Sequence, residues 1–98
     1  MKRESAIEKT VKFGALTMGV TSWKMNAAGE RGKPDQMFLI PGGRPFFIEF
    51  KRPDGVLSMH QRVMIERLRH YGYDVEVHYE VQSALDAIKK RVLQSETI

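Results

Sequence analysis

The chain has 98 residues, with 16 Lys and Arg against 12 Asp and Glu, a net charge of +4, and no cysteine. This length accommodates one hydrophobic core, so we expect a single domain over residues 1–98. The lack of cysteine excludes disulfide scaffolds, thiolate zinc sites and cysteine nucleophiles. No apolar stretch approaches the roughly 20 residues that a membrane span needs. The basic balance allows a polyanionic partner such as nucleic acid but does not by itself indicate one.

The first half of the chain is typical of one helix followed by three short strands. Apolar side chains recur at helical spacing over residues 4–17, and residues 20–25 alternate as in a strand. Residues 26–35 contain two glycines and a proline, which predicts a loop. Residues 36–40 and 46–51 are apolar and flank a Gly-Gly turn, so we expect a β-hairpin there.

The second half predicts a helix, a strand and a last helix. Ser58 begins a helix that Gly72 ends, in the position after a helix that glycine favours. A strand follows at residues 74–79, and an amphipathic helix at residues 82–94. The expected order of elements is therefore α-β-β-β-α-β-α.

The second strand of the hairpin carries two charged residues in an apolar setting. Because side chains alternate along a strand, Glu49 and Lys51 project from the same face as Phe47. A carboxylate and an ammonium group therefore lie together on one side of the sheet. The strand alone is equally compatible with a surface ion pair on an edge strand.

A second carboxylate precedes the first strand of the hairpin. Antiparallel pairing through the turn can bring Asp35 near the end of the strand that holds Glu49 and Lys51. Two carboxylates that close repel each other unless a cation lies between them. Oxygen ligands of this kind suit Mg²⁺ or Mn²⁺. A lysine beside such a metal can orient or deprotonate a water molecule and stabilise charge on a phosphate.

The spacing of these residues resembles a known nuclease pattern. Pro34-Asp35, then thirteen residues, then Glu49-Phe50-Lys51 is similar to the PD-(D/E)XK nuclease superfamily. The resemblance narrows to the VRR-NUC family, the virus-type replication-repair nucleases, on a wider set of segments: Gly32–Asp35, Pro41–Gly43, Phe47–Pro53, Leu57-Ser58-X-X-Gln61 and Leu68-X-X-X-Gly72-Tyr73. It runs from about residue 4 to 90 and is similar to the stand-alone phage or prophage members. It implies a restriction-endonuclease-like fold of the α/β class, in which helices flank a mixed four-stranded sheet.

The resemblance also implies roles for individual residues. Asp35, Glu49, the backbone carbonyl of Phe50 and an acidic residue of the first helix, Glu8, would bind Mg²⁺ or Mn²⁺. Lys51 would be the catalytic lysine. Gln61 matches the family's additional motif, although its spacing from Ser58 is also that of a helix capping box. Glu8 could equally be a solvated helix residue.

Basic residues near these positions are candidates for contacts with the DNA backbone. Lys24, Arg31 and Lys33 flank the loop before Asp35, and Arg52 follows the catalytic lysine. The alternative for Arg52 is an ordinary solvated charge. His60 and His78 are lone histidines, for which we expect surface or strand positions.

The expected function is metal-dependent hydrolysis of phosphodiester bonds in DNA, selective for branched or junction DNA. The resemblance implies a phage- or prophage-encoded protein in the cytoplasm of a bacterial host cell. Two other classes stay open: a nucleic-acid-binding module of phage origin that no longer cleaves, and a structural phage protein. The intact set of Asp35, Glu49 and Lys51 argues against the first, and the second predicts neither metal nor DNA binding.

Large aromatic side chains are numerous for so thin a core, and the set comprises Trp23, Phe38, Phe46, Phe47 and Phe50. We expect some of them to lie at an exposed face that a homodimer would cover. The alternative is a monomer in which all are buried. For Trp23 we expect core or dimer packing rather than stacking on a base.

Overall fold

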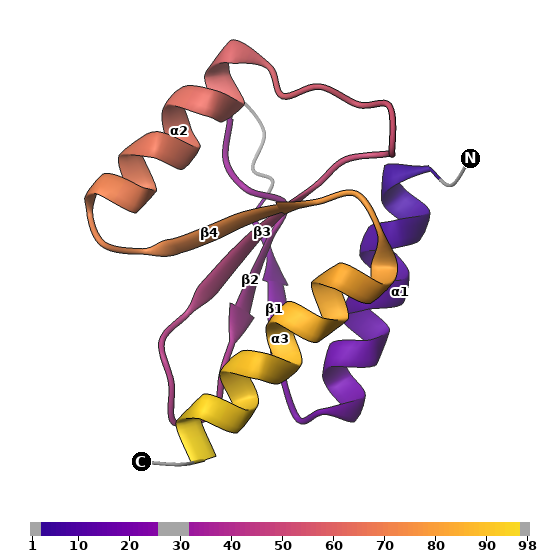
Figure 1. Cartoon of the computed structure of the whole chain (residues 1–98), viewed down its shortest axis with the longest axis vertical. Coiled ribbons are helices and arrows are strands. Elements are labelled where there is room, and N and C mark those ends of the chain that lie inside the picture. The colour runs from indigo at the N-terminus through magenta and orange to yellow at the C-terminus, as the bar shows by residue number, and fades with distance from the viewer. Residues whose placement is uncertain (1–2, 26–31, 97–98) are drawn as a thin grey trace.

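The computed structural model describes residues 3–25 and 32–96. It contains seven elements in the predicted order: α1 (Glu4–Thr17), β1 (Thr21–Lys24), β2 (Gln36–Leu39), β3 (Phe46–Phe50), α2 (Met59–His70), β4 (Asp74–His78) and α3 (Val81–Glu96). The strands form one sheet in the order β1-β2-β3-β4 (Figure 1). The pairs β1–β2 and β2–β3 are antiparallel and β3–β4 is parallel. The predicted α/β fold with a mixed four-stranded sheet is confirmed.

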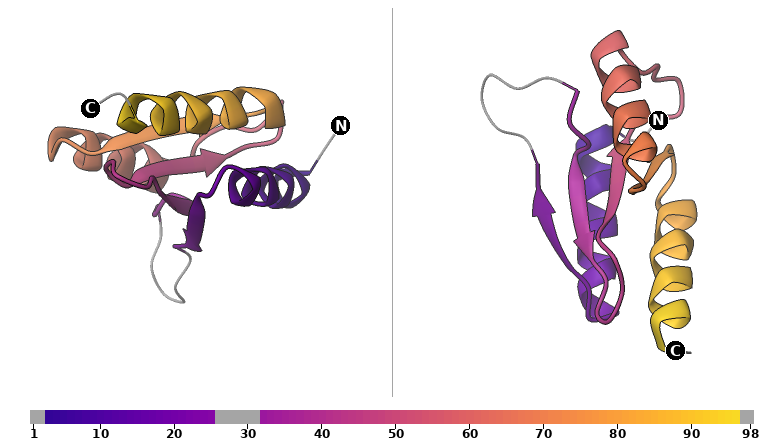
Figure 2. Two further views of the ribbon diagram at one scale, coloured as in Figure 1. Left: turned by 90° about the horizontal axis from the view of Figure 1, so that it is seen from below. Right: turned by 90° about the vertical axis from the view of Figure 1, so that its left-hand side faces the viewer.

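Helices cover the two faces of the sheet unequally. α1 and α3 contact each other and pack on one face, where they enclose the main core with the buried side chains Phe38, Phe46, Ile48 and Phe50. α2 packs on the opposite face over a smaller cluster around Phe47. Because α2 lies against β4, it leaves β1 uncovered on its side of the sheet, as the right-hand view of Figure 2 shows.

Element boundaries follow local sequence signals. α2 begins at Ser58, whose side chain accepts a hydrogen bond from the backbone N–H of Gln61. α1 ends before Gly19, which has a positive φ of 79°. β1 is shorter than the predicted strand over residues 20–25, because Val20 is already in the core and hydrogen-bonds back to Ala15 of the helix.

The aromatic residues differ from expectation in one respect. Phe38, Phe46, Phe47 and Phe50 are all buried within the single chain, so they leave no open aromatic face. Trp23 is 58% exposed, and the prediction that it packs in the core is wrong. The physical reason is the position of α2, which covers β3 and β4 but not β1.

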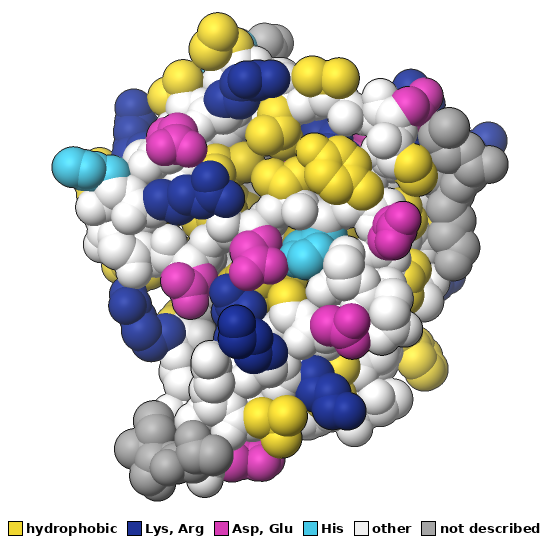
Figure 3. Space-filling model, in the orientation of Figure 1, with side chains coloured by type: hydrophobic (Ala, Val, Ile, Leu, Met, Phe, Trp, Pro, Cys, Tyr) yellow, Lys and Arg dark blue, Asp and Glu magenta, His cyan; other side chains and the backbone are white. Residues whose placement is uncertain are grey.

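No helix in the described part of the chain is both long and apolar enough to cross a membrane. On the face in the view of Figure 3, acidic and basic side chains are interspersed around β4 and α3 rather than segregated by sign.

Candidate active site

The predicted catalytic residues meet at one end of the sheet. β2 begins directly after Asp35, and β3 runs antiparallel to it with Gln36 paired to Ile48. That register places Asp35 opposite Glu49 on the face that α2 covers. Lys51 follows two residues later on the same face, and the first turn of α2 brings Gln61 across the sheet to them. The structure therefore gathers four of the predicted residues into one cluster.

Asp35 is held in place by the neighbouring strand. Its Oδ2 atom accepts a hydrogen bond of 2.7 Å from the backbone N–H of Phe50. Burial raises the pKa of this carboxyl, the Phe50 hydrogen bond opposes that rise, and the negative charge of Glu8 adds to it. The balance leaves the Asp35 pKa above its ordinary value.

Glu49 is the most perturbed acid of the cluster. It is 2% exposed, and its Oε2 atom accepts a hydrogen bond of 2.7 Å from Gln61 while the Lys51 ammonium lies 3.8 Å away. Its other oxygen, Oε1, is buried without a hydrogen-bond partner. Burial, and then the charge of Asp35, raise the pKa of Glu49 to about 8 despite Lys51. An unsatisfied buried oxygen next to a second carboxylate is a position that a cation would stabilise.

Gln61 has two roles at once. In the capping box its Oε1 atom accepts a 2.8 Å hydrogen bond from the Ser58 backbone N–H. Its Nε2 atom donates to Glu49. The two alternatives that the sequence left open are thus compatible, because the two ends of one amide serve them separately.

A close backbone contact joins the segment before Asp35 to the start of α2. Gly32 has a φ of +85°, and a Cβ atom there would lie 2.7 Å from the carbonyl carbon of His60 and 3.3 Å from the backbone nitrogen of Gln61. Only glycine fits both the conformation and the space. This contact fixes the distance between the two segments that carry Asp35 and Gln61. The sequence indicated Gly32 only as a member of a motif.

Glu8 lies at the edge of the cluster. Its Oε2 atom accepts hydrogen bonds from Gln36 Nε2 and from Lys24 Nζ, the latter at 3.1 Å. Within residues 3–25 and 32–96, no three His, Cys, Asp or Glu side chains are grouped so that they could hold a metal ion. Glu8 is thus near enough to raise the pKa of Asp35 but is not gathered with Asp35 and Glu49. Sequence reasoning missed the buried Gln36, a polar residue at the start of an apolar strand.

Asp35 and Glu49 fit a divalent metal by the chemistry of their donors. Both supply hard carboxylate oxygens, and the Phe50 carbonyl that follows Glu49 could add a third oxygen. Two observations favour a cation here: the Oε1 atom of Glu49 has no hydrogen-bond partner, and the pKa values of both carboxyl groups are raised, mainly by burial.

The predicted DNA contacts are distributed around the cluster. Lys24 projects from β1 with its side chain 55% exposed, although it pairs with Glu8. Arg52 forms an exposed ion pair with Asp54 at 3.0 Å. Lys33 lies in the segment that leads into Asp35, and Arg31 is outside the described residues.

Three comparisons with known proteins show what the chain is similar to. The family model of the VRR-NUC domain matches residues 4–82. A protein named "Putative nuclease p44", from Acyrthosiphon pisum secondary endosymbiont phage 1, is 31% identical over 88 residues, which cover 88% of this chain and 95% of that protein. A solved structure described as a VRR_NUC domain superimposes with a TM-score of 0.79 at 26% identity, covering 91% of this chain and 97% of the other.

Proposed function

Since the chain belongs to the VRR-NUC nuclease family, we propose that it is a Mg²⁺- or Mn²⁺-dependent nuclease that hydrolyses phosphodiester bonds in DNA. The observation that supports this most is the pair Asp35 and Glu49, opposed across β2 and β3 with one Glu49 oxygen lacking a partner. Lys51 lies beside them and is almost fully buried. A lysine and two acids of this kind at a strand end match the needs of hydrolysis at phosphate.

Each residue of the cluster would have a separate role in the reaction. Asp35, Glu49 and the Phe50 carbonyl would hold the metal, which when bound polarises a phosphate and lowers the pKa of a coordinated water. The Lys51 ammonium would orient the attacking water and offset the charge that develops on the phosphate. Gln61 holds the Oε2 atom of Glu49 by a hydrogen bond, and the Oε1 atom, which has no partner, would be available to the metal. Glu8 would contribute from the edge of the site.

Binding of DNA would rest on its phosphates. Lys24, Arg31, Lys33 and Arg52 surround the cluster in sequence and are the proposed phosphate contacts. Affinity would then fall steeply with salt, because each neutralised phosphate releases counterions.

The preferred substrate in this proposal is branched DNA, cut by a homodimer in the cytoplasm of a bacterial host. Support for the dimer comes from exposed apolar side chains on two adjacent helices, Phe13 and Leu16 on α1 and Leu93 on α3. A two-fold pair would cover such side chains and set two active sites at a fixed separation. Light scattering at micromolar concentration tests the dimer, and Phe13→Glu should shift the mass toward that of a monomer.

A cleavage panel tests the main proposal. Flap, four-way junction, nicked and linear DNA are incubated with the protein and Mg²⁺, Mn²⁺ or EDTA. We expect cleavage with either metal, none with EDTA, and the highest rate on a branched substrate. DNA binding without cleavage under all metal conditions would favour a non-catalytic binding module. Absence of both binding and cleavage would refute a role in DNA metabolism.

A further inference from the structure

An exposed indole lies on the same face of the sheet as the catalytic carboxylates. Trp23 pairs with Met37 across β1–β2, and Met37 pairs with Phe47 across β2–β3. Paired residues point to the same side of a sheet, and Phe47 shares its side with Glu49 two residues later. Trp23 therefore faces the side on which Asp35 and Glu49 meet.

The ring is accessible because nothing in the described chain covers it. α2 packs over β4 on this side, and the right-hand view of Figure 2 shows no helix crossing β1 there. Trp23 remains 58% exposed, whereas its cross-strand neighbour Met37 is partly buried against the smaller core cluster. More than half of the Trp23 side chain is thus open to solvent.

Strand geometry gives the distance from this ring to the active site. The backbone of Met25 hydrogen-bonds to the carbonyl of Asp35 at 2.9 Å, and Trp23 is two residues before Met25. Two residues of strand span about 7 Å. Stacked nucleotides advance about 3.4 Å each along one strand of DNA. A base one to a few nucleotides from a phosphate bound at Asp35 would therefore reach the indole.

From this placement, and resting on the proposed nuclease function, we propose that Trp23 is a stacking platform for an unpaired base near the scissile phosphate. A base inside a duplex already has both faces stacked, so only a nucleotide freed from pairing can offer a face to the ring. The contact would make flaps, junction strands and single strands better substrates than continuous duplex. It would also provide a physical cause for selectivity toward branched DNA.

A nucleobase fits this surface better than a second copy of the chain. The other large exposed apolar side chains lie on different elements, for example Phe13 and Leu16 on α1 and Met59 on α2. A single ring with one partly buried neighbour falls far short of the roughly 800 Å² that each partner contributes to a standard interface.

Fluorescence provides a direct test, because Trp23 is the sole tryptophan of the chain. Emission excited at a tryptophan-selective wavelength is followed while a single-stranded thymidine oligonucleotide is added in EDTA, so that no cleavage occurs. We expect quenching by the single strand and much less by a fully paired duplex of the same length. The signal requires DNA binding only and therefore does not depend on the cleavage activity.

Variants then separate stacking from a general loss of fold. Trp23→Ala should weaken single-strand binding and flap cleavage by about 5- to 100-fold, with little change on linear duplex, and Trp23→Phe should restore most of the loss. The control is Tyr71→Ala. Tyr71 is 64% exposed and sits at the far end of α2, about 15 Å along the helix from Gln61.

Three results would overturn the stacking role. The first is that single-stranded DNA does not quench the fluorescence, and the second is that Trp23→Ala loses cleavage of duplex and flap equally. The third is that Trp23→Ala converts a dimer into a monomer while the ratio of flap to duplex cleavage stays unchanged. The last result would assign the ring to a protein interface. If the wild type quenches with single strand but cleaves no DNA under any metal condition, the nuclease proposal fails and the stacking site stands.

Discussion

Glu49 and Glu76 lie on neighbouring strands of one sheet, yet their surroundings are opposite. Glu49, on β3, faces a second carboxylate and keeps one oxygen without a partner. Glu76, on β4, faces α3 and has both oxygens paired, at 2.7 Å to His78 and at 2.9 Å to Arg91. Burial raises the pKa of both carboxyl groups. At Glu76, the contacts with His78 and Arg91 outweigh burial and lower the pKa. At Glu49, the charge of Asp35 adds to burial, and the pKa rises to about 8.

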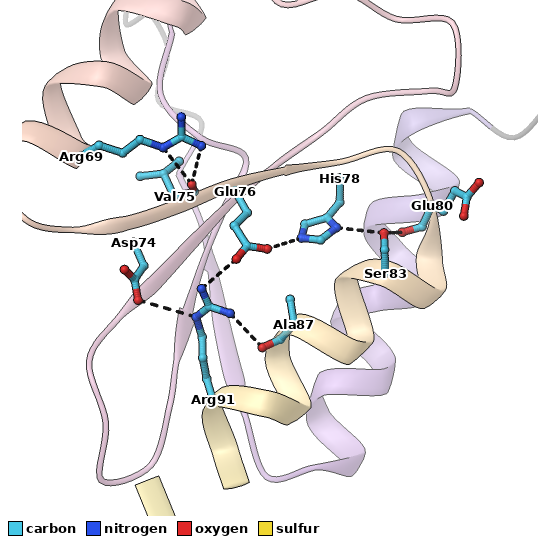
Figure 4. A network of polar contacts seen from close by, with 9 residues as sticks. All are labelled: Arg69, Asp74, Val75, Glu76, His78, Glu80, Ser83, Ala87 and Arg91. Atoms are coloured by element: carbon cyan, nitrogen blue, oxygen red, sulfur yellow. Dashed lines mark hydrogen bonds and ion pairs between the residues drawn. The ribbon is translucent and has the colours of Figure 1, made fainter. Parts of the chain in front are cut away.

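Hydrogen bonds and ion pairs around Glu76, here called the Glu76 network, connect α3 to the sheet (Figure 4). Arg91 reaches from α3 to Glu76 and to Asp74, and its guanidinium lies 3.6 Å from the centre of the Phe46 ring. His78 links Glu76 to Ser83 at the start of α3. His78 is therefore a strand residue with a structural role, in line with its predicted strand position.

The contrast separates charges that are paired within the chain from a pair of acids that, in the proposed function, a metal would complete. Charges in the Glu76 network compensate one another within the chain. At Asp35 and Glu49, two carboxyl groups are held together by the hairpin register and by Gln61. This arrangement disfavours the state in which both are ionised, and a bound cation would relieve that cost. Strongly perturbed acids of this kind are typical of functional sites.

The largest effects on cleavage should come from substitutions in the Asp35–Glu49–Lys51 cluster. Asp35→Ala, Glu49→Ala and Lys51→Ala should each lower cleavage by about 100-fold or more, because each removes a metal ligand or the charge beside the phosphate. Glu76→Ala is the matched control and should cleave at close to the wild-type rate at a temperature where it is folded. Wild-type turnover in any of the three variants, with contaminating nuclease excluded, would remove that residue from the site.

Gly32→Ala should disturb the same site through the backbone. The added Cβ atom would clash with the His60 backbone, and the positive φ of residue 32 disfavours any L side chain. We therefore expect a loss of about 3 kcal/mol in the free energy of unfolding. Cleavage should fall as well, since Asp35 and Gln61 move apart. Gly19→Ala has a similar φ of +79° but nothing within 4 Å, and should cost only about 1 kcal/mol. Equal denaturation midpoints for the two variants would contradict the steric argument.

Arg91→Ala should weaken the Glu76 network and leave the rate of cleavage unchanged. It leaves Glu76 and Asp74 without their guanidinium partner and uncovers the Phe46 ring, which should cost about 2 kcal/mol. Urea denaturation measures the loss, and Lys90→Ala, one residue away on the exposed side of α3, is the control. A variant that lost cleavage while remaining folded would show that the two networks are coupled.

The two acids should also respond differently to pH in the absence of metal. Because the pKa of Glu49 is raised from 4.5 to about 8 on folding, the folded chain binds this proton more tightly than the unfolded chain, and stability falls as pH rises through that window. Glu76 acts in the opposite sense, and its contribution is lost as pH falls below the ordinary value of 4.5. The melting temperature in EDTA should therefore decline from pH 5 to pH 8, and Glu49→Gln should remove most of that decline.

Metal should reverse the trend. Mn²⁺ competes with the proton on Glu49, so the melting-temperature gain at saturating Mn²⁺ should be larger at pH 8 than at pH 6. Glu76→Gln should retain this gain and Glu49→Gln should blunt it. A wild-type melting temperature that Mn²⁺ leaves unchanged at both pH values would count against a site formed before DNA binds.

Much of the site was determined by local sequence. Strand alternation placed Glu49 and Lys51 on one face, and the short Gly-Gly turn between β2 and β3 set a register that puts Asp35 opposite Glu49. The Ser58–Gln61 spacing predicted the start of α2 and its capping box. These features depend on periodicity and on residues close in the chain, which is why the sequence sufficed for them.

Only the tertiary structure decided which elements meet. It brought Gln61 to Glu49, turned Glu8 toward Lys24 and Gln36, and left Trp23 exposed. It also joined Arg91 to Glu76, a pairing with no short-range signal. Periodicity states which face of an element is apolar but not which other element covers it. Here α2 packs on β4 and over the cluster around Phe47 but leaves Trp23 of β1 exposed, so the candidate site is buried while an aromatic ring on the same face of the sheet is open.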